Sequence, residues 1–194
     1  MKHVKTSPKT LLFLSLPTLL ILASGCGILV GNVRPVNEKS ETYGVADLSQ
    51  ENKDWQKLDS ASKGVDPTDP NVTSTEVADV AYQSKKTASI ISINSACRPA
   101  QASAQNDNLH NDTNLLFLGF GEVTLREEKP MTLQNLPALQ TTVQGKLNGE
   151  PMKVRTIVMR RSSCLYDLMY VATPVHFAEN EAEFSHFIAS LKLK

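Results

Sequence analysis

The chain has 194 residues, 41% of them hydrophobic and 21% charged, a composition that excludes a disordered chain and a polytopic membrane protein. Its 20 basic and 20 acidic side chains cancel, and aromatic residues make up 6%. Nucleic-acid binders usually carry a basic surface or stacking aromatics, so we expect no nucleic-acid partner. The length suits one folded domain.

The N-terminus has the pattern of a secretory signal peptide. Lys2, Lys5 and Lys9 form a positive region without acidic residues, and residues 11–22 form an apolar run of signal-peptide length. The run ends in the sequence LASGC at residues 22–26, which resembles the lipobox of bacterial lipoproteins. The resemblance implies cleavage before Cys26, so we expect residues 1–25 to be a signal peptide.

The same resemblance implies a lipid anchor on Cys26. In lipoproteins the cysteine thiol receives a diacylglycerol and the amine is usually acylated as well, with chains such as palmitate; two or more chains anchor a protein firmly. Gly27 stands where Asp would mark inner-membrane retention, which favours the outer membrane of the cell envelope. The alternative is an uncleaved anchor, because the apolar stretch continues to Val30 and reaches 20 residues.

Charge divides the rest of the chain. Residues 31–80 contain five basic and ten acidic side chains, and residues 31–54 show little apolar periodicity. Such a segment is typical of a solvated linker. We therefore expect a flexible tether over residues 26–53 and a single domain over residues 54–194.

The domain shows several strand patterns. Residues 55–58, 79–83 and 87–95 are predicted strands, the first of them at a sheet edge. Residues 139–147 alternate between apolar and polar side chains, and Asn148-Gly149 then fits a two-residue hairpin turn. Residues 152–161 and 164–173 carry apolar side chains on both faces, so we expect them to be central strands.

Two helices are predicted. Asp112 is a candidate cap for a helix that extends to Val123. A C-terminal helix presents one apolar stripe, with Asn180 and Glu183 in a capping-box-like start. Strands mixed with two helices predict an α+β domain in which an antiparallel sheet is layered between helices.

The C-terminal 59 residues, from LPALQTTVQGKLNGE to HFIASLKLK, resemble the end of PsbP-like proteins of the Mog/PsbP fold. In that family a hairpin meander precedes a Tyr-containing strand, a Phe and a helix that ends in Ser-Leu or Ser-Phe. The resemblance implies a PsbP-like sandwich. It brings no shared catalytic residue, so none is assigned.

Two cysteines remain once Cys26 is lipidated. Cys97 and Cys164 are an even number in an oxidising compartment, which predicts a disulfide; two buried free thiols are the alternative. They lack the partner spacing of a metal site, so we expect no metal or cofactor. Of the histidines, His110 and His186 are expected at the surface.

These features favour a membrane-anchored envelope lipoprotein that acts as a non-enzymatic accessory or binding subunit with an envelope protein partner. The competing hypothesis is an enzyme or a small-ligand carrier. Its site would be a cleft between the sheet and the C-terminal helix, lined by Tyr166, Tyr170 and His176. A cleft with converging polar groups would favour this second hypothesis, and a filled interior the first.

Overall fold

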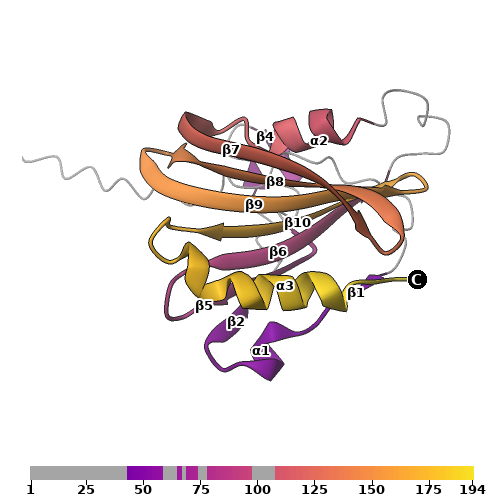
Figure 1. Ribbon diagram of the computed structural model, residues 1–194, viewed down its shortest axis with the longest axis horizontal. Helices are drawn as coiled ribbons and strands as arrows, with labels where there is room; N and C mark the ends of the chain where they lie inside the picture. The colour runs from indigo at the N-terminus through magenta and orange to yellow at the C-terminus, as the bar shows by residue number, and fades with distance from the viewer. Residues whose placement is uncertain (1–42, 59–64, 67–68, 74–77, 98–107) are drawn as a thin grey trace, which may run out of the picture.

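A computed structural model describes residues 43–58, 65–66, 69–73, 78–97 and 108–194. Its main element is a seven-stranded antiparallel sheet with the strand order β2-β5-β6-β10-β9-β8-β7 (Figure 1). The strands are β2 (Trp55–Leu58), β5 (Val80–Ser84), β6 (Ile90–Cys97), β7 (Phe120–Leu133), β8 (Leu136–Leu147), β9 (Glu150–Arg161) and β10 (Cys164–Ala172).

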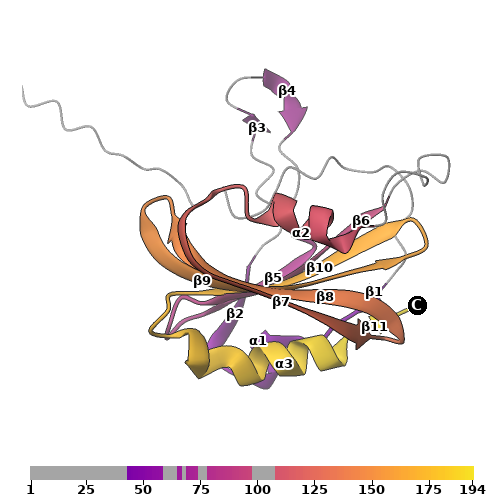
Figure 2. The ribbon, with the colours of Figure 1, turned by 45° about the horizontal axis from the view of Figure 1, so that its top comes forward.

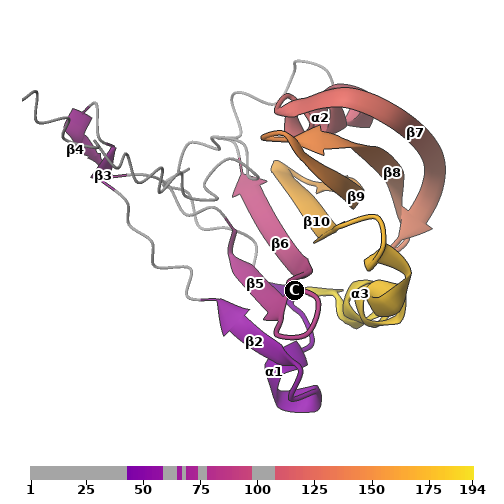
Figure 3. The ribbon, with the colours of Figure 1, turned by 90° about the vertical axis from the view of Figure 1, so that its left-hand side faces the viewer.

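Helices lie on both faces of this sheet. Helix α3 (Glu181–Ser190) covers one face, and α2 (Leu109–Leu116) lies over the other (Figure 2). A 3-10 turn, η2 (Phe177–Asn180), leads into α3, and α1 (Leu48–Glu51) lies beside β2 (Figure 3). Short strand pairs join β1 (Tyr43–Gly44) to β11 (Lys192–Leu193) and β3 (Val65–Asp66) to β4 (Asp69–Thr73). The expected α+β class, with an antiparallel sheet between helices, is confirmed.

The four longest strands form a meander of hairpins. Asn148 and Gly149 join β8 to β9 with positive φ angles of 52° and 86°, so the predicted turn is confirmed; both residue types tolerate this conformation. Strand β10 is buried along nearly its whole length, as expected for a central strand. The predicted strand at residues 55–58 is also confirmed, and Trp55 is only 2% exposed.

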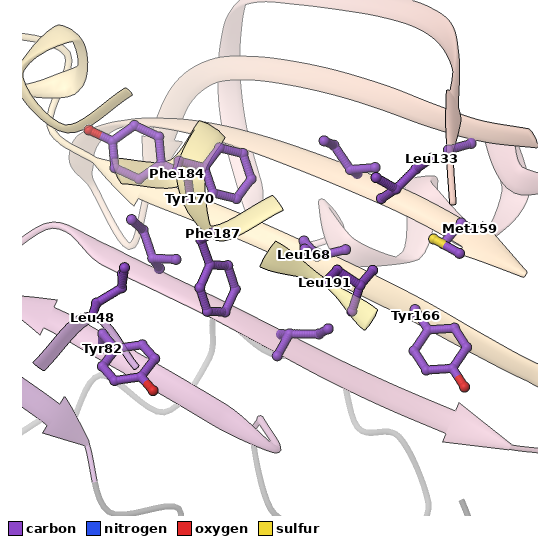
Figure 4. Packing of buried hydrophobic residues seen from close by; sticks show 14 of the residues in the cluster. Leu48, Tyr82, Leu133, Met159, Tyr166, Leu168, Tyr170, Phe184, Phe187 and Leu191 are labelled. Carbon is purple, nitrogen blue, oxygen red and sulfur yellow. The ribbon is translucent and has the colours of Figure 1, made fainter. Parts of the chain in front are cut away.

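The main core fills the space between the sheet and α3. Tyr82, Tyr166 and Leu168 on the strands meet Phe184, Phe187 and Leu191 from α3 and its end (Figure 4). These side chains are almost completely removed from water, and burial of this kind provides most of the free energy that holds a helix on a sheet.

The helix predicted from Asp112 to Val123 is wrong in both bounds. Asn108 caps α2 instead, because its side chain accepts the backbone N–H of His110 at 2.9 Å. The helix ends at Leu116, and Phe120 begins the 14-residue strand β7. This strand lies at the edge of the sheet and is mostly exposed, so its sequence lacks the alternation that marks a half-buried strand.

The predicted capping box of α3 does not form. The side chain of Asn180 makes no cap bond to the helix. Its amide nitrogen donates instead to Thr87 Oγ1 at 2.8 Å and to Ser89 Oγ at 3.3 Å. Asn180 therefore ties the start of α3 to the turn before β6.

The expected boundary between tether and domain at Asp54 is also wrong. Residues 43–53 contain β1 and α1, and Leu48 is 2% exposed within the main core. A leucine so thoroughly buried belongs to the domain rather than to a solvated linker. Residues 1–42, with the expected signal peptide and the first part of the tether, lie outside the described residues.

Candidate functional site

Cys26, the expected lipidation site, lies outside the residues that the structure describes. Within the described ranges, none of the helices combines the length and apolarity that a membrane crossing requires. The lipid anchor therefore stays a prediction from the sequence.

The two remaining cysteines form a disulfide. Cys97 ends β6 and Cys164 begins β10, and strand pairing sets the two residues directly opposite each other, with Cα atoms 3.9 Å apart. Both side chains are buried. The predicted pairing is present in the structure, and it links the two strands at the centre of the sheet.

The expected cleft under the C-terminal helix is filled. Tyr166 and Tyr170 lie on the face of β10 that α3 covers, and both are fully buried (Figure 4). The hydroxyl of Tyr170 donates to the backbone oxygen of Phe177 at 2.7 Å, so it is engaged within the fold. The side chain of His176 is 44% exposed and sits 2.6 Å from Glu179 Oε1. The two tyrosines therefore belong to the packed core, whereas the His176 side chain lies at the surface.

The opposite face has a polar row between α2 and β7. Glu128 Oε2 lies 2.6 Å from Nδ1 of His110, and Glu128 Oε1 accepts from Arg126 Nη2 at 2.6 Å. Arg126 also donates to the side chain of Asn114 and lies over the ring of Phe117. The hydrogen bond from Arg126, with a further one from His110, lowers the pKa of Glu128. A carboxylate that stays ionised holds the imidazole in one orientation.

A shallow hollow of about 510 Å³ opens beside this row. Its walls are mostly apolar, and Asn108 and His110 supply the polar groups; it is lined by Asn108, Leu109, His110, Pro130, Pro137, Ala138 and Leu139. The hollow is within the size range of small-molecule sites. The hollow combines the start of α2 with residues of β7 and β8. Sequence reasoning missed this site because it assigned neither the start of α2 at residues 108–110 nor the edge strand β7.

A buried ion pair holds α2 in place. Arg160 on β9 donates hydrogen bonds from two of its nitrogens to the carboxylate of Asp112. Its Nη2 lies 2.7 Å from Oδ2, and its Nε lies 3.0 Å from the same oxygen. Helix α2 thus buries Asp112 and Thr113 and leaves Leu115 60% exposed. Leu118 and Val123, which follow α2, are exposed as well. Exposed apolar side chains mark a contact surface where they form a contiguous patch.

A second buried carboxylate lies in the sheet itself. Asp167 on β10 accepts from the amide nitrogen of Asn94 at 3.2 Å. Burial raises the pKa of Asp167 from its ordinary 3.8 to about 7, and the charge of Asp79 adds to the rise, while the Asn94 hydrogen bond acts against it. Removal from water disfavours the charged form of a carboxyl group.

The chemistry that these groups offer is limited. In the described part of the chain, no three His, Cys, Asp or Glu side chains are grouped to hold a metal ion. The His110–Glu128 pair can accept or donate a proton, and the hollow beside it can receive an apolar group.

Comparison with known proteins finds likeness in structure alone. No sequence-family profile matches the chain, and no curated protein matches its sequence. The solution structure of cyanobacterial PsbP from Synechocystis matches with a TM-score of 0.49 and 10% identity, over 83% of this chain and 98% of that one.

Two further structures are similar at the same level. PA94, a Pseudomonas aeruginosa protein of unknown function, matches with a TM-score of 0.47 and 12% identity, over 83% of this chain and 89% of that one. LpqN, a protein involved in cell envelope biogenesis of Mycobacterium tuberculosis, matches with a TM-score of 0.44 and 14% identity, over 81% of this chain and 87% of that one. Such distant likenesses carry no information on activity or partners.

Proposed function

We propose that this chain is an envelope lipoprotein, anchored through Cys26 in the outer membrane rather than the inner membrane. Its domain acts as a non-enzymatic accessory or binding subunit of an envelope complex. The observation that carries the proposal is the buried Cys97–Cys164 disulfide in a chain with a lipobox-like LASGC sequence. Disulfides persist in oxidising compartments outside the cytoplasm, which agrees with export.

The filled interior supports a binding role over catalysis. The space between the sheet and α3 is occupied by aromatic and aliphatic side chains, so it leaves no room for a substrate there. The α2–β7 face remains available for a protein partner. It presents Leu115, Leu118 and Val123 beside the polar row.

The lipid anchor is tested by the Cys26→Ser variant. Acyl labelling of the chain is expected to vanish, since a serine hydroxyl does not replace the thiol in the transfer. Gly27→Asp is the matched variant for sorting: it should keep the label and move the protein to the inner membrane in an enterobacterial host. Labelling of the Cys26→Ser chain, or a purified protein that begins at Met1, would contradict the proposal.

The partner surface is tested by substitutions at two equally exposed positions. Leu118 and Val175 are each 79% exposed, and only Leu118 lies on the α2–β7 face. After cross-linking in intact envelopes, Leu118→Asp should reduce recovery of a specific cross-linked protein, and Val175→Asp should leave it unchanged. Equal recovery with both variants would exclude this face as the contact.

A second candidate function is the binding of a small apolar ligand in the hollow beside His110. The apolar lining and the Glu128-held imidazole favour it. Titration of a fluorescent probe with an apolar ring system, such as the anionic dye 1-anilinonaphthalene-8-sulfonate, would test it. Leu139→Gln should abolish probe binding if the hollow is the site, and unchanged binding would reject it.

A further inference from the structure

Three buried threonines lie on α2 and the two strands beneath it without hydrogen-bond partners for their hydroxyl groups. Thr113 on α2, Thr141 on β8 and Thr156 on β9 are each 0% exposed. Their Oγ1 atoms make no hydrogen bond with any residue that the structure describes. Nearly all buried polar groups in folded proteins have a partner, and a hydroxyl can both donate and accept. Three unpaired hydroxyls therefore require a physical explanation.

Strand register sets two of these hydroxyls side by side. Thr141 and Thr156 are Cα partners in the β8–β9 pair. Directly opposite residues of an antiparallel pair point to the same face, with Cβ atoms about 4.5–5.5 Å apart. That face is the one under α2, because Val143 and Val154, two residues away on each strand, share an apolar cluster with Phe117.

The helix places the third hydroxyl above this pair. At one end, Leu109 on α2 and Leu139 on β8 line the same hollow, and at the other end Phe117 shares a cluster with Val143. The helix rises about 12 Å between its two anchor residues, and β8 rises about 13 Å between its own two. The midpoint of each span is one of the three threonines, so the hydroxyl on α2 lies over the pair on the sheet (Figure 2).

We propose that Thr113, Thr141 and Thr156 bind one water molecule that is buried between α2 and the sheet. A water molecule donates two hydrogen bonds and accepts two, so it can satisfy three neutral hydroxyls at once. Buried waters in proteins typically make about three hydrogen bonds to groups of this kind. The neighbouring charge on α2, Asp112, is paired with Arg160, which favours a neutral ligand over an ion.

The water joins α2 to both strands beneath it. A buried hydroxyl without a partner costs free energy, so three of them would weaken the attachment of the helix. With the water bound, α2 is held at one point by the ion pair between Asp112 and Arg160 and at a second point by the bridge. The site thereby fixes the helix of the α2–β7 face, and it requires no partner to do so.

Two neighbouring threonines on β8 provide a matched test. Thr141 and Thr142 are both buried, and they point to opposite faces of the sheet. The hydroxyl of Thr142 has a protein partner, since its Oγ1 accepts from Arg155 Nε at 3.2 Å. The full chain is unfolded with urea in detergent and followed by far-ultraviolet circular dichroism.

The sign of the stability change decides whether the hydroxyl is hydrated. If water satisfies Thr141, then Thr141→Val should lower the folding equilibrium constant by about two- to tenfold, as Thr142→Val should. If the hydroxyl is unhydrated, Thr141→Val should raise that constant, because valine has the same shape and removes an unpaired polar group.

A shared water also couples the three positions. The triple variant Thr113→Val, Thr141→Val, Thr156→Val should lose less stability than the sum of the three single variants, because the water leaves once its partners are gone. Oxygen-17 relaxation dispersion of the solvent counts water molecules with long residence times in the protein. It should find one such water fewer in the triple variant, and Thr142→Val should leave the count unchanged.

Three results would overturn the proposal. They are a rise in the folding equilibrium constant for Thr141→Val, losses that add up across the three positions, and an unchanged count of long-lived waters in the triple variant. If the triple variant fails to fold, the double variant Thr141→Val, Thr156→Val serves instead. It leaves the water a single hydroxyl, so the same loss of one long-lived water is expected.

Discussion

Removal of the Cys97–Cys164 disulfide tests how the centre of the sheet is stabilised. The bond closes a loop with a sequence separation of 67 residues, and the loop-closure entropy of such a loop corresponds to about 4 kcal/mol of stability. In the native state β6 and β10 are already paired over eight residues, so the bond changes the folded structure little. Its effect should fall on the unfolded chain.

The assay is urea unfolding followed by far-ultraviolet circular dichroism. The double variant Cys97→Ala, Cys164→Ala should lose about 4 kcal/mol of unfolding free energy, plus about 1 kcal/mol for each sulfur removed from a buried site. Wild-type protein reduced with dithiothreitol is the control, since it keeps both buried sulfur atoms and loses only the stabilisation that comes from loop closure. A loss below about 1 kcal/mol on reduction would refute the loop-closure reasoning.

Three further predictions concern single residues, each measured by urea unfolding. Leu48→Ala should cost about 2 to 4 kcal/mol if α1 belongs to the core, and a cost below about 0.5 kcal/mol would return residues 43–53 to the tether. Gly145→Ala should cost about 1 to 3 kcal/mol, because a Cβ there would lie 2.9 Å from the oxygen of Gly121; Gly121→Ala, with nothing within 4 Å, is the matched control and should cost less. Folding raises the pKa of Asp167 to about 7. The contribution of this carboxyl to the unfolding free energy should therefore be greatest below pH 4 and fall by about 4 kcal/mol as the pH rises from 4 to 7. Asp167→Asn should flatten that fall, and an unchanged pH profile would show that the carboxyl is hydrated.

The local features of this fold could be read from its sequence. Asn148-Gly149 specifies a turn with positive φ wherever it occurs between alternating segments. Strands β9 and β10 have apolar side chains on both faces, and this pattern alone assigns them to the centre of the sheet. The disulfide followed from an even number of cysteines, although only strand register shows that the two residues face each other.

The remaining features depend on contacts between distant residues. Edge strand β7 has little burial to mark it, so its assignment depends on pairing with β8. Asp112 looks like a helix cap in sequence, but its partner Arg160 is 48 residues away. Residues 43–53 lie within an acidic stretch with little apolar periodicity, so they resemble part of a linker until their contacts with the C-terminus are known. Turns and amphipathic patterns are local properties of a chain, whereas edges, ion pairs and docked termini arise only when the tertiary structure brings separate segments together.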